Sequence, residues 1–263
     1  MNILPKKSLG QNFLIDEDII NIIINLGNIG EEDFILEVGP GTGNLTEKIL
    51  EKNPHKFTVV EKDKRLVEIL KKKFNEKINI INDDILNFSF ENNLNKKMII
   101  FGNLPYNIST QILSKWIKIE KLDNLCKKFI LMFQKEVADR IIADVNSKNY
   151  SRLSIISNWK LDIKKIIDIS PKSFNPIPKG KSTILTFEPK KNFYKLEDPK
   201  NLEHITNVFF NQRRKMIKKP MKILFKNYDE ISKILSLDLN LRPQNLSNLT
   251  YYKICSIYER SIK

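Results

Sequence analysis

The chain has 263 residues, 45 of them Lys or Arg and 31 of them Asp or Glu, and its net charge of +14 favours a polyanionic partner. Two isolated cysteines, Cys126 and Cys255, and two isolated histidines, His55 and His204, argue against a disulfide framework and against a metal site. Because we find neither a signal sequence nor an uncharged apolar run of about 18 residues, we expect a soluble protein of the reducing cytoplasm, away from membranes.

Apolar runs and amphipathic runs alternate in the first half of the chain. Five short apolar runs bounded by turn residues are predicted strands, at 34–38, 57–61, 78–82, 98–102 and 129–134. Runs with a helical period lie between or after them, at 44–52, 64–74, 110–118 and 136–145. Because strands separated by single helices form right-handed crossovers, we predict a doubly wound α/β fold with a mostly parallel sheet.

The pattern changes after residue 150. Three strand-like runs follow without helices between them, at 151–159, 162–170 and 182–188, and they predict an antiparallel end to the same sheet. The segment 188–200 carries two prolines and many charges and is a predicted linker, and the pattern is mostly helical from residue 201. We therefore divide the chain into an α/β domain at residues 1–188 and a small helical domain at residues 189–263.

Residues that follow the predicted strands are candidate site residues, because ligands bind at the carboxyl ends of strands in open α/β sheets. The first strand leads into EVGPGTGNLTE, where Gly39, Gly41 and Gly43 let a ligand approach the backbone. The second ends at Glu61, where an acid can accept both hydroxyls of a ribose, and the third ends near Asp84, which can meet an adenine. Each acid alone is typical of a solvated loop, but the three features in strand order predict a nucleoside-containing cofactor.

The glycine spacing separates two candidate cofactors. A dinucleotide loop reads G-x-G-x-x-G and places a pyrophosphate at the helix start, whereas this loop reads G-x-G-x-G after Glu37. The spacing is closer to that of a site for S-adenosylmethionine, which has no phosphate. A dinucleotide oxidoreductase is the weaker alternative, because it leaves the turn after the fourth strand without a role.

That turn reads GNLPYNIS and contains Asn103, Leu104, Pro105 and Tyr106 in succession. Pro105 cannot donate to a sheet and holds Leu104 extended, which leaves the Leu104 carbonyl beside the Asn103 amide oxygen. Two acceptors therefore stand next to the flat ring of Tyr106. The alternative is an ordinary strand-to-helix turn with Asn as a cap.

These motifs together resemble the KsgA-type small-subunit ribosomal RNA adenine dimethyltransferases. The resemblance rests on Glu61 and on KKSLGQNFL, EVGPGTGNLT, NDDIL, FGNLPYNIS, QKEVADRI, SFNPIPKGKST and FFNQRRKM, in the family's order. It implies a class I, Rossmann-like methyltransferase fold, S-adenosylmethionine as cofactor, and N6,N6-dimethylation of two adjacent adenosines in a 3′-terminal hairpin of 16S rRNA. It also implies a pre-ribosomal 30S particle as partner and a role in small-subunit biogenesis, and we expect a monomer without a metal.

The resemblance further implies roles for single residues. The implied cofactor contacts are Asn12, Leu14, Gly39, Gly41, Glu61, Asp84 and Asn103. The implied catalytic residues are Asn103, Leu104, Pro105 and Tyr106, with Phe174 as a second aromatic for the target base. The Asn103 side-chain oxygen and the Leu104 carbonyl would each accept one hydrogen of the adenine amine, which favours a pyramidal nitrogen aimed at the sulfonium methyl. Tyr106 and Phe174 would stack on the extruded base.

Much of the positive charge lies near the C-terminus. Residues 189–263 contain 16 basic and 7 acidic residues, a net charge of +9. The predicted RNA-binding residues in this part are Arg213, Arg214, Lys218, Lys219 and Lys222. The lysines recur at helical spacing, with Met216, Ile217, Ile223 and Leu224 predicted to face inward and Pro220 predicted to interrupt the helix. An ordinary solvated helix face is the alternative.

The sequence thus predicts an enzyme that dimethylates adenosines of small-subunit rRNA. Two alternatives stay open. The first is a large-subunit rRNA adenine-N6 methyltransferase of the antibiotic-resistance type, which shares the glycine loop and a similar turn. The second is a noncatalytic ribosome-assembly or transcription factor that keeps the fold for binding nucleic acid, against which the intact Asn103, Glu61 and Asp84 argue.

Overall fold

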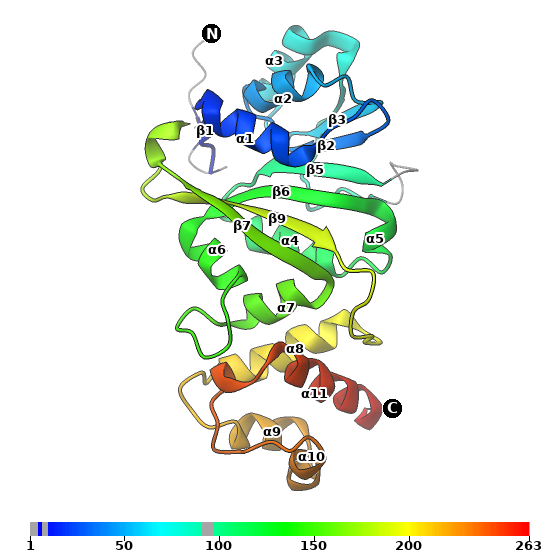
Figure 1. Cartoon of the computed structure of the whole chain (residues 1–263), viewed down its shortest axis with the longest axis vertical. Helices are drawn as coiled ribbons and strands as arrows, with labels where there is room; N and C mark the ends of the chain where they lie inside the picture. The colour runs from blue at the N-terminus through cyan, green and yellow to red at the C-terminus, as the bar shows by residue number, and fades with distance from the viewer. Residues whose placement is uncertain (1–4, 7–9, 91–96, 263) are drawn as a thin grey trace. The chain divides into compact units, whose positions relative to one another are not determined.

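The computed structural model of the chain describes residues 5–6, 10–90 and 97–262 (Figure 1). By their contacts the residues form two units, one of Met1–Ala138 and Asp162–Pro189, the other of Asp139–Leu161 and Lys190–Lys263. The second unit therefore takes in residues 139–161, which the division after residue 188 assigned to the α/β domain.

The first unit is built on a seven-stranded sheet with the order β4-β3-β2-β5-β6-β9-β7. Five strands run parallel, namely β2 (Phe34–Val38), β3 (Lys56–Val60), β4 (Asn79–Ile81), β5 (Met98–Asn103) and β6 (Cys126–Gln134). The last strand, β9 (Ser182–Pro189), pairs antiparallel with β6, and β7 (Leu161–Ile169) lies at the edge. The predicted fold class and the five predicted parallel strands are confirmed.

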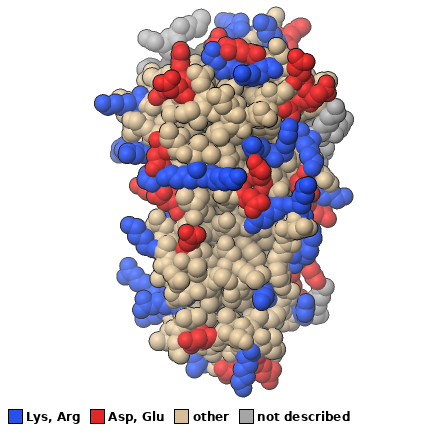
Figure 2. Space-filling view, viewed as in Figure 1, with Lys and Arg blue, Asp and Glu red and all other residues tan. Residues whose placement is uncertain are grey.

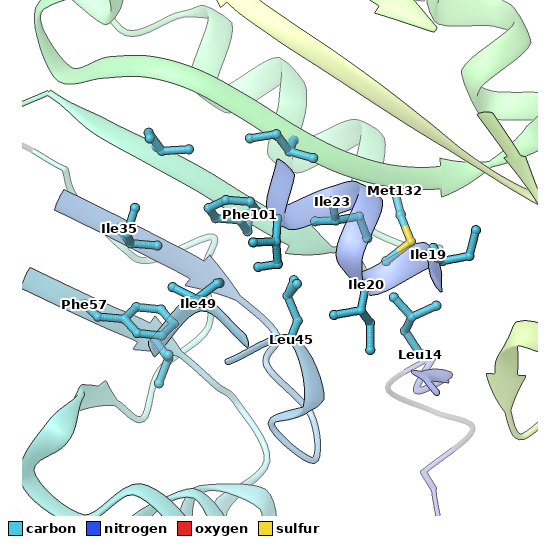
Figure 3. Packing of buried hydrophobic residues seen from close by; sticks show 14 of the residues in the cluster. Leu14, Ile19, Ile20, Ile23, Ile35, Leu45, Ile49, Phe57, Phe101 and Met132 are labelled. Atoms are coloured by element: carbon cyan, nitrogen blue, oxygen red, sulfur yellow. The ribbon is translucent and has the colours of Figure 1, made fainter. Parts of the chain in front are cut away.

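The helices of this unit follow from their caps and their apolar faces. They are α1 (Glu17–Gly27), α2 (Asn44–Leu50), α3 (Lys64–Phe74), α4 (Ser109–Ile117), α5 (Leu122–Leu125) and α6 (Lys135–Ile141), which extends across the boundary with the second unit. The Asp16 side chain caps α1 by accepting from the Ile19 N–H at 3.2 Å. Figure 3 shows Ile19, Ile20 and Ile23 of α1 packed near Phe101 and Met132 of the sheet. Helix α1 thus covers one face of the sheet, although the alternation of strands and helices did not predict it.

The segment 151–159 corrects one prediction, because it forms helix α7 (Arg152–Lys160) and not a strand. The Ser151 N–H donates to the Ser154 hydroxyl at 3.0 Å, which favours a helix start. Its buried Ile155 and Trp159 pack in the second unit, where α7 contacts α8 (Pro199–Phe210) and α11 (Asn248–Ser261). Packing against these helices outweighs the β propensity of the isoleucines.

The rest of the second unit is helical, as predicted from residue 201, and also contains α9 (Lys218–Leu224) and α10 (Tyr228–Ile234). Pro220 lies buried in the first turn of α9, so it does not interrupt a helix as predicted. Ile217 is buried as expected, but Met216 and Ile223 are 55% and 60% exposed. They do not face inward, because the predicted continuous helix is instead a turn followed by the short α9.

Three further properties concern the described residues. No helix among them has the length and apolarity that crossing a bilayer requires. Both cysteines are free and buried. No group of three or more His, Cys, Asp or Glu side chains within this part of the chain could hold a metal ion.

Candidate cofactor and substrate site

A pocket of about 180 Å³ opens at the carboxyl ends of β2, β3 and β5 in the first unit. Its lining includes nine of the predicted cofactor and catalytic residues: Asn12, Leu14, Gly39, Gly41, Glu61, Asp84, Asn103, Pro105 and Tyr106. The structure thus brings together residues that lie up to 94 positions apart in the sequence. Residues 7–9 of the KKSLGQNFL motif fall outside the described residues.

The glycine loop between β2 and α2 is compact, because its glycines adopt positive φ angles. Gly41 has a φ of +59°, and a Cβ there would lie 2.7 Å from the ring of Phe13. Gly43 has a φ of +82°, and a Cβ there would lie 2.5 Å from the ring of Phe74. Side chains at these positions would force the loop away from the N-terminal arm (residues 10–14) or from α3, so both glycines keep the loop compact.

Glu61 is 7% exposed at the end of β3. Burial raises the pKa of its carboxyl, while N–H groups of Asp63 and Gly41 favour the ionised form. The Asp63 N–H donates to Glu61 Oε1 at 2.8 Å. The Glu61 carboxylate is thus held in place by backbone N–H groups at the lining of the pocket.

Asp63 was not predicted, yet it ties the N-terminal arm to the site. Its Oδ2 accepts from Gln11 Nε2 at 3.1 Å, and its Oδ1 accepts from the Arg65 N–H at 3.1 Å at the start of α3. The hydrogen bonds from Arg65 hold the pKa of Asp63 far below its usual value, although burial alone would raise it. Asp63 therefore stays ionised and holds the arm against α3.

Asp84 also has fixed partners. Its Oδ1 accepts from the Leu86 N–H at 2.9 Å, and its Oδ2 lies 2.7 Å from Lys62 Nζ. Burial alone would raise the pKa of Asp84, but the hydrogen bonds from Lys62 and Leu86 lower it overall. Asp84 is therefore an ionised acceptor at the pocket, and Lys62 is a partner that the sequence pattern did not single out.

Glu37 lies under the glycine loop at the end of β2 and is 2% exposed. Its Oε2 accepts from the Thr46 hydroxyl at 2.7 Å. The pKa of Glu37 is raised to about 8, mainly by burial, while the Thr46 hydrogen bond opposes the rise and the nearby Glu61 adds to it. A neutral acid thus lines the pocket near pH 7.

Asn103 has a defined orientation at the end of β5. Its side-chain Nδ2 donates to the backbone carbonyl of Asn12 at 2.7 Å. Because the amide nitrogen is held by the arm, the amide oxygen Oδ1 is the atom left to accept from a ligand. The neighbouring Leu104 is 1% exposed and is not among the residues that line the pocket, so its side chain anchors the turn in the core.

Tyr106 and Phe174 differ in their placement. The Tyr106 hydroxyl lies 2.6 Å from the Ser182 hydroxyl, which is fully buried at the start of β9, and burial raises the pKa of Tyr106. Phe174 is 1% exposed within the hydrophobic core cluster, where β8 (Phe174–Asn175) pairs with β1 (Phe13–Leu14). The structure therefore does not bring the Phe174 ring into the pocket lining.

Ser182 is a contact of Tyr106 that the sequence analysis did not predict, although Ser182 belongs to the SFNPIPKGKST motif.

The predicted RNA-binding residues fall into two groups in the second unit. Arg214, Lys218, Lys219 and Lys222 are exposed. Arg213 is only partly exposed, and its guanidinium donates to the carbonyl oxygens of Ser147 and Lys148. Four of the five cations are thus accessible to a polyanion, with Lys222 Nζ over the Tyr228 ring at 5.1 Å, whereas Arg213 links two loops. On the face drawn in Figure 2, basic side chains are interspersed with acidic ones and do not gather into one patch.

Comparisons with known proteins find relatives that match nearly the whole chain. The family model described as ribosomal RNA adenine dimethylase matches residues 3–263. The ribosomal RNA small subunit methyltransferase A of Pelagibacter ubique (strain HTCC1062) is 54% identical over 259 residues, 98% of this chain and 98% of that protein.

Two solved structures are similar over most of their length. A dimethyladenosine transferase from Plasmodium falciparum has a TM-score of 0.78 at 25% identity, with 94% of this chain and 98% of that chain covered. The 23S rRNA methyltransferase ErmE has a TM-score of 0.67 at 20% identity, with coverage of 92% and 98%. At that identity the second likeness shows the fold alone.

Proposed function

Because the chain belongs to the ribosomal RNA adenine dimethylase family, we propose that its pocket holds S-adenosylmethionine and that the turn from Asn103 to Tyr106 presents an adenine to it. Family membership confirms the resemblance drawn from the sequence motifs. The chain is therefore an S-adenosylmethionine-dependent rRNA adenine dimethyltransferase, and it does not belong to the dinucleotide oxidoreductases.

The pocket residues fit this cofactor. Glu61 presents a carboxylate oxygen to the ribose hydroxyls, and Asp84 presents an ionised acceptor to the adenine amine. The arm residues Asn12 and Leu14 and the backbone at Gly39 surround the methionine part. When bound, S-adenosylmethionine supplies an electrophilic methyl group on a positively charged sulfur. The acids that line the pocket favour this charge.

Asn103 carries the proposed mechanism. An adenine amine is a poor nucleophile because its lone pair is delocalised into the ring. Since Asn103 Nδ2 is bound to the Asn12 carbonyl, its Oδ1 accepts one amine hydrogen while the Leu104 carbonyl accepts the other. The two acceptors favour a pyramidal nitrogen and aim its lone pair at the methyl group. Tyr106, steadied by Ser182, stacks on the extruded base.

We further propose the substrate and setting of the reaction. The target is small-subunit rRNA in a pre-ribosomal 30S particle, with two adjacent adenosines of a 3′-terminal hairpin dimethylated, and the enzyme acts as a cytoplasmic monomer. The name of the Pelagibacter relative supports the small subunit as target, and the exposed Arg214, Lys218, Lys219 and Lys222 support contact with RNA.

One experiment tests this function. The purified protein is incubated with labelled S-adenosylmethionine and unmethylated small subunits, and the modified nucleotides are mapped by mass spectrometry. We expect dimethyladenosine in small-subunit rRNA. Methylation of large-subunit rRNA instead would point to the resistance-type enzyme. Binding to the particle without methyl transfer would point to a noncatalytic assembly factor.

A further inference from the structure

The loop at residues 176–181 is held beside the pocket at both ends. On one side, Asn175 pairs with Phe13 in the β1–β8 ladder, and Phe13 lines the pocket. On the other side, the loop leads directly into Ser182, whose hydroxyl is 2.6 Å from the Tyr106 hydroxyl. Figure 1 shows this yellow-green connection next to β1. The loop is therefore tied to the residues that surround the proposed target base.

The exposed side chains of this loop are basic or apolar. Lys179 and Lys181 are exposed, and Ile177 is 68% exposed between two prolines. Residues 170–187 contain no acid. The nearest acid in the sequence before them, Asp168, lies 2.9 Å from Lys165 and 3.5 Å from Lys135. Lys179 and Lys181 thus have no acid close to them along the chain.

These features suit a nucleic-acid strand better than a solvated surface. Lysines that lack nearby acids attract phosphates, and the flanking prolines restrict the backbone before any partner binds. An isoleucine exposed at this level is unfavourable in water, whereas an apolar side chain can fill the space that an unstacked base leaves. Extrusion of the target adenosine would create such a space close to Tyr106.

We propose that the loop 176–181 binds the RNA strand next to the target adenosine, with Lys179 and Lys181 on the flanking phosphates and Ile177 against the neighbouring base. This inference rests on the proposed function. It assigns an RNA contact to the catalytic unit, apart from the basic residues of α9. The loop then holds the strand while the turn from Asn103 to Tyr106 holds the base.

Charge removal provides the first test. The double variant K179Q/K181Q is compared with the control variant K56Q/K97Q. The control removes two exposed lysines at the amino ends of β3 and β5, whereas the pocket opens at the carboxyl ends. Binding to unmethylated small subunits is measured between about 50 and 200 mM salt. We expect the loop variant to bind on the order of tenfold more weakly at the lower salt and to lose about two units of salt slope. Its affinity for S-adenosylmethionine should match that of the wild type.

Proximity provides the second test. A photoreactive benzoylphenylalanine replaces Ile177 in one variant and the exposed Ile223 of α9 in the other, and both are crosslinked to small subunits. Crosslinks from position 177 should map within a few nucleotides of the methylated adenosines, and those from position 223 should map elsewhere. If the wild type methylates the particle but both loop variants behave like their controls, the loop assignment is wrong and the proposed function stands. If the wild type neither binds nor methylates the particle, the proposed function itself fails.

Discussion

Two regions of the molecule use charged side chains in opposite ways. One is the pocket of the first unit, and the other is the basic surface at residues 214–222, which includes α9. In the pocket, Glu37, Glu61 and Asp84 are buried or partly buried, and each has hydrogen-bond partners inside the protein. On α9, Lys218, Lys219 and Lys222 are exposed, and the ammonium of Lys222 lies 5.1 Å from the centre of the Tyr228 ring. The first region is organised before a ligand arrives, so each residue there has a specific effect. The second acts through summed charge, so its residues have graded and salt-dependent effects.

Asn103→Ala offers the strongest test of this contrast. We expect turnover to fall by about 10²- to 10³-fold, because a positioned acceptor that acts in the transition state is lost. Cofactor affinity measured by calorimetry should change little. A near-normal turnover would show that Asn103 is not a catalytic residue. It would also show that substitutions in the pocket have effects as small as those on the basic surface.

Glu61→Ala should act on binding and not on the chemical step. We expect affinity for S-adenosylmethionine to fall by about 10- to 100-fold, since a hydrogen bond to a charged group contributes about 1.5–3 kcal/mol. Turnover at saturating cofactor should recover. Glu47→Ala, which removes an exposed acid paired with Lys73, serves as the control. Equal affinities in the two variants would place Glu61 outside the cofactor site.

Replacing Arg214, Lys218, Lys219 and Lys222 with Gln tests the other region. We expect binding to small subunits to weaken about tenfold near physiological salt, where screening is strong, and the salt slope to fall by about one unit per lost phosphate contact. Arg213→Gln is the matched control, because Arg213 donates to backbone carbonyls inside the unit. Arg213→Gln should lower the free energy of unfolding and leave the salt slope of binding unchanged. A smaller salt slope in this control would show that Arg213 also contacts RNA, which contradicts its assignment as a structural residue.

The pH dependence of the free energy of unfolding tests whether the buried Glu37 is held neutral in the pocket. Glu37 has a pKa of about 8 in the folded protein against 4.5 for an ordinary glutamate, so the folded state binds more protons between these values. Stability should therefore fall as pH rises through this range, by up to about 1.4 kcal/mol per pH unit. Glu37→Gln should flatten the profile in urea unfolding measured from about pH 5 to pH 8. Parallel profiles for the two proteins would show that Glu37 is not held neutral.

Features that depend on local sequence could be predicted, and features that depend on tertiary packing could not. The parallel strands and the positions of Glu61 and Asp84 follow from local apolar runs and from the rule that ligands bind at strand ends, so they could be predicted. Helix α7 could not, because its isoleucines favour a strand locally and only packing against α8 and α11 makes the helix.

Contacts between distant residues explain the remaining differences at the site. The hydroxyls of Tyr106 and Ser182 meet across 76 positions of sequence, a separation that no periodicity reports. The ring of Phe174 is buried because β8 pairs with the N-terminal arm, and Arg213 is engaged because the loop at Ser147 folds back to it. Each of these pairings depends on tertiary structure, whereas motif and charge patterns describe one segment at a time.

The N-terminal arm also imposes an order on synthesis and assembly. Asn12 meets Asn103, and Leu14 pairs with Phe174, so partners of the arm lie 91 and 160 positions further along the chain. Residues 12–14 leave the ribosome long before those partners exist, and they must wait while the sheet is completed. A nascent chain that stops before β8 contains the central strands and Asn103 but lacks the strand that pairs with Phe13 and Leu14 of the arm. We therefore expect the N-terminal arm to gain its strand partner only once nearly the whole first unit has been translated.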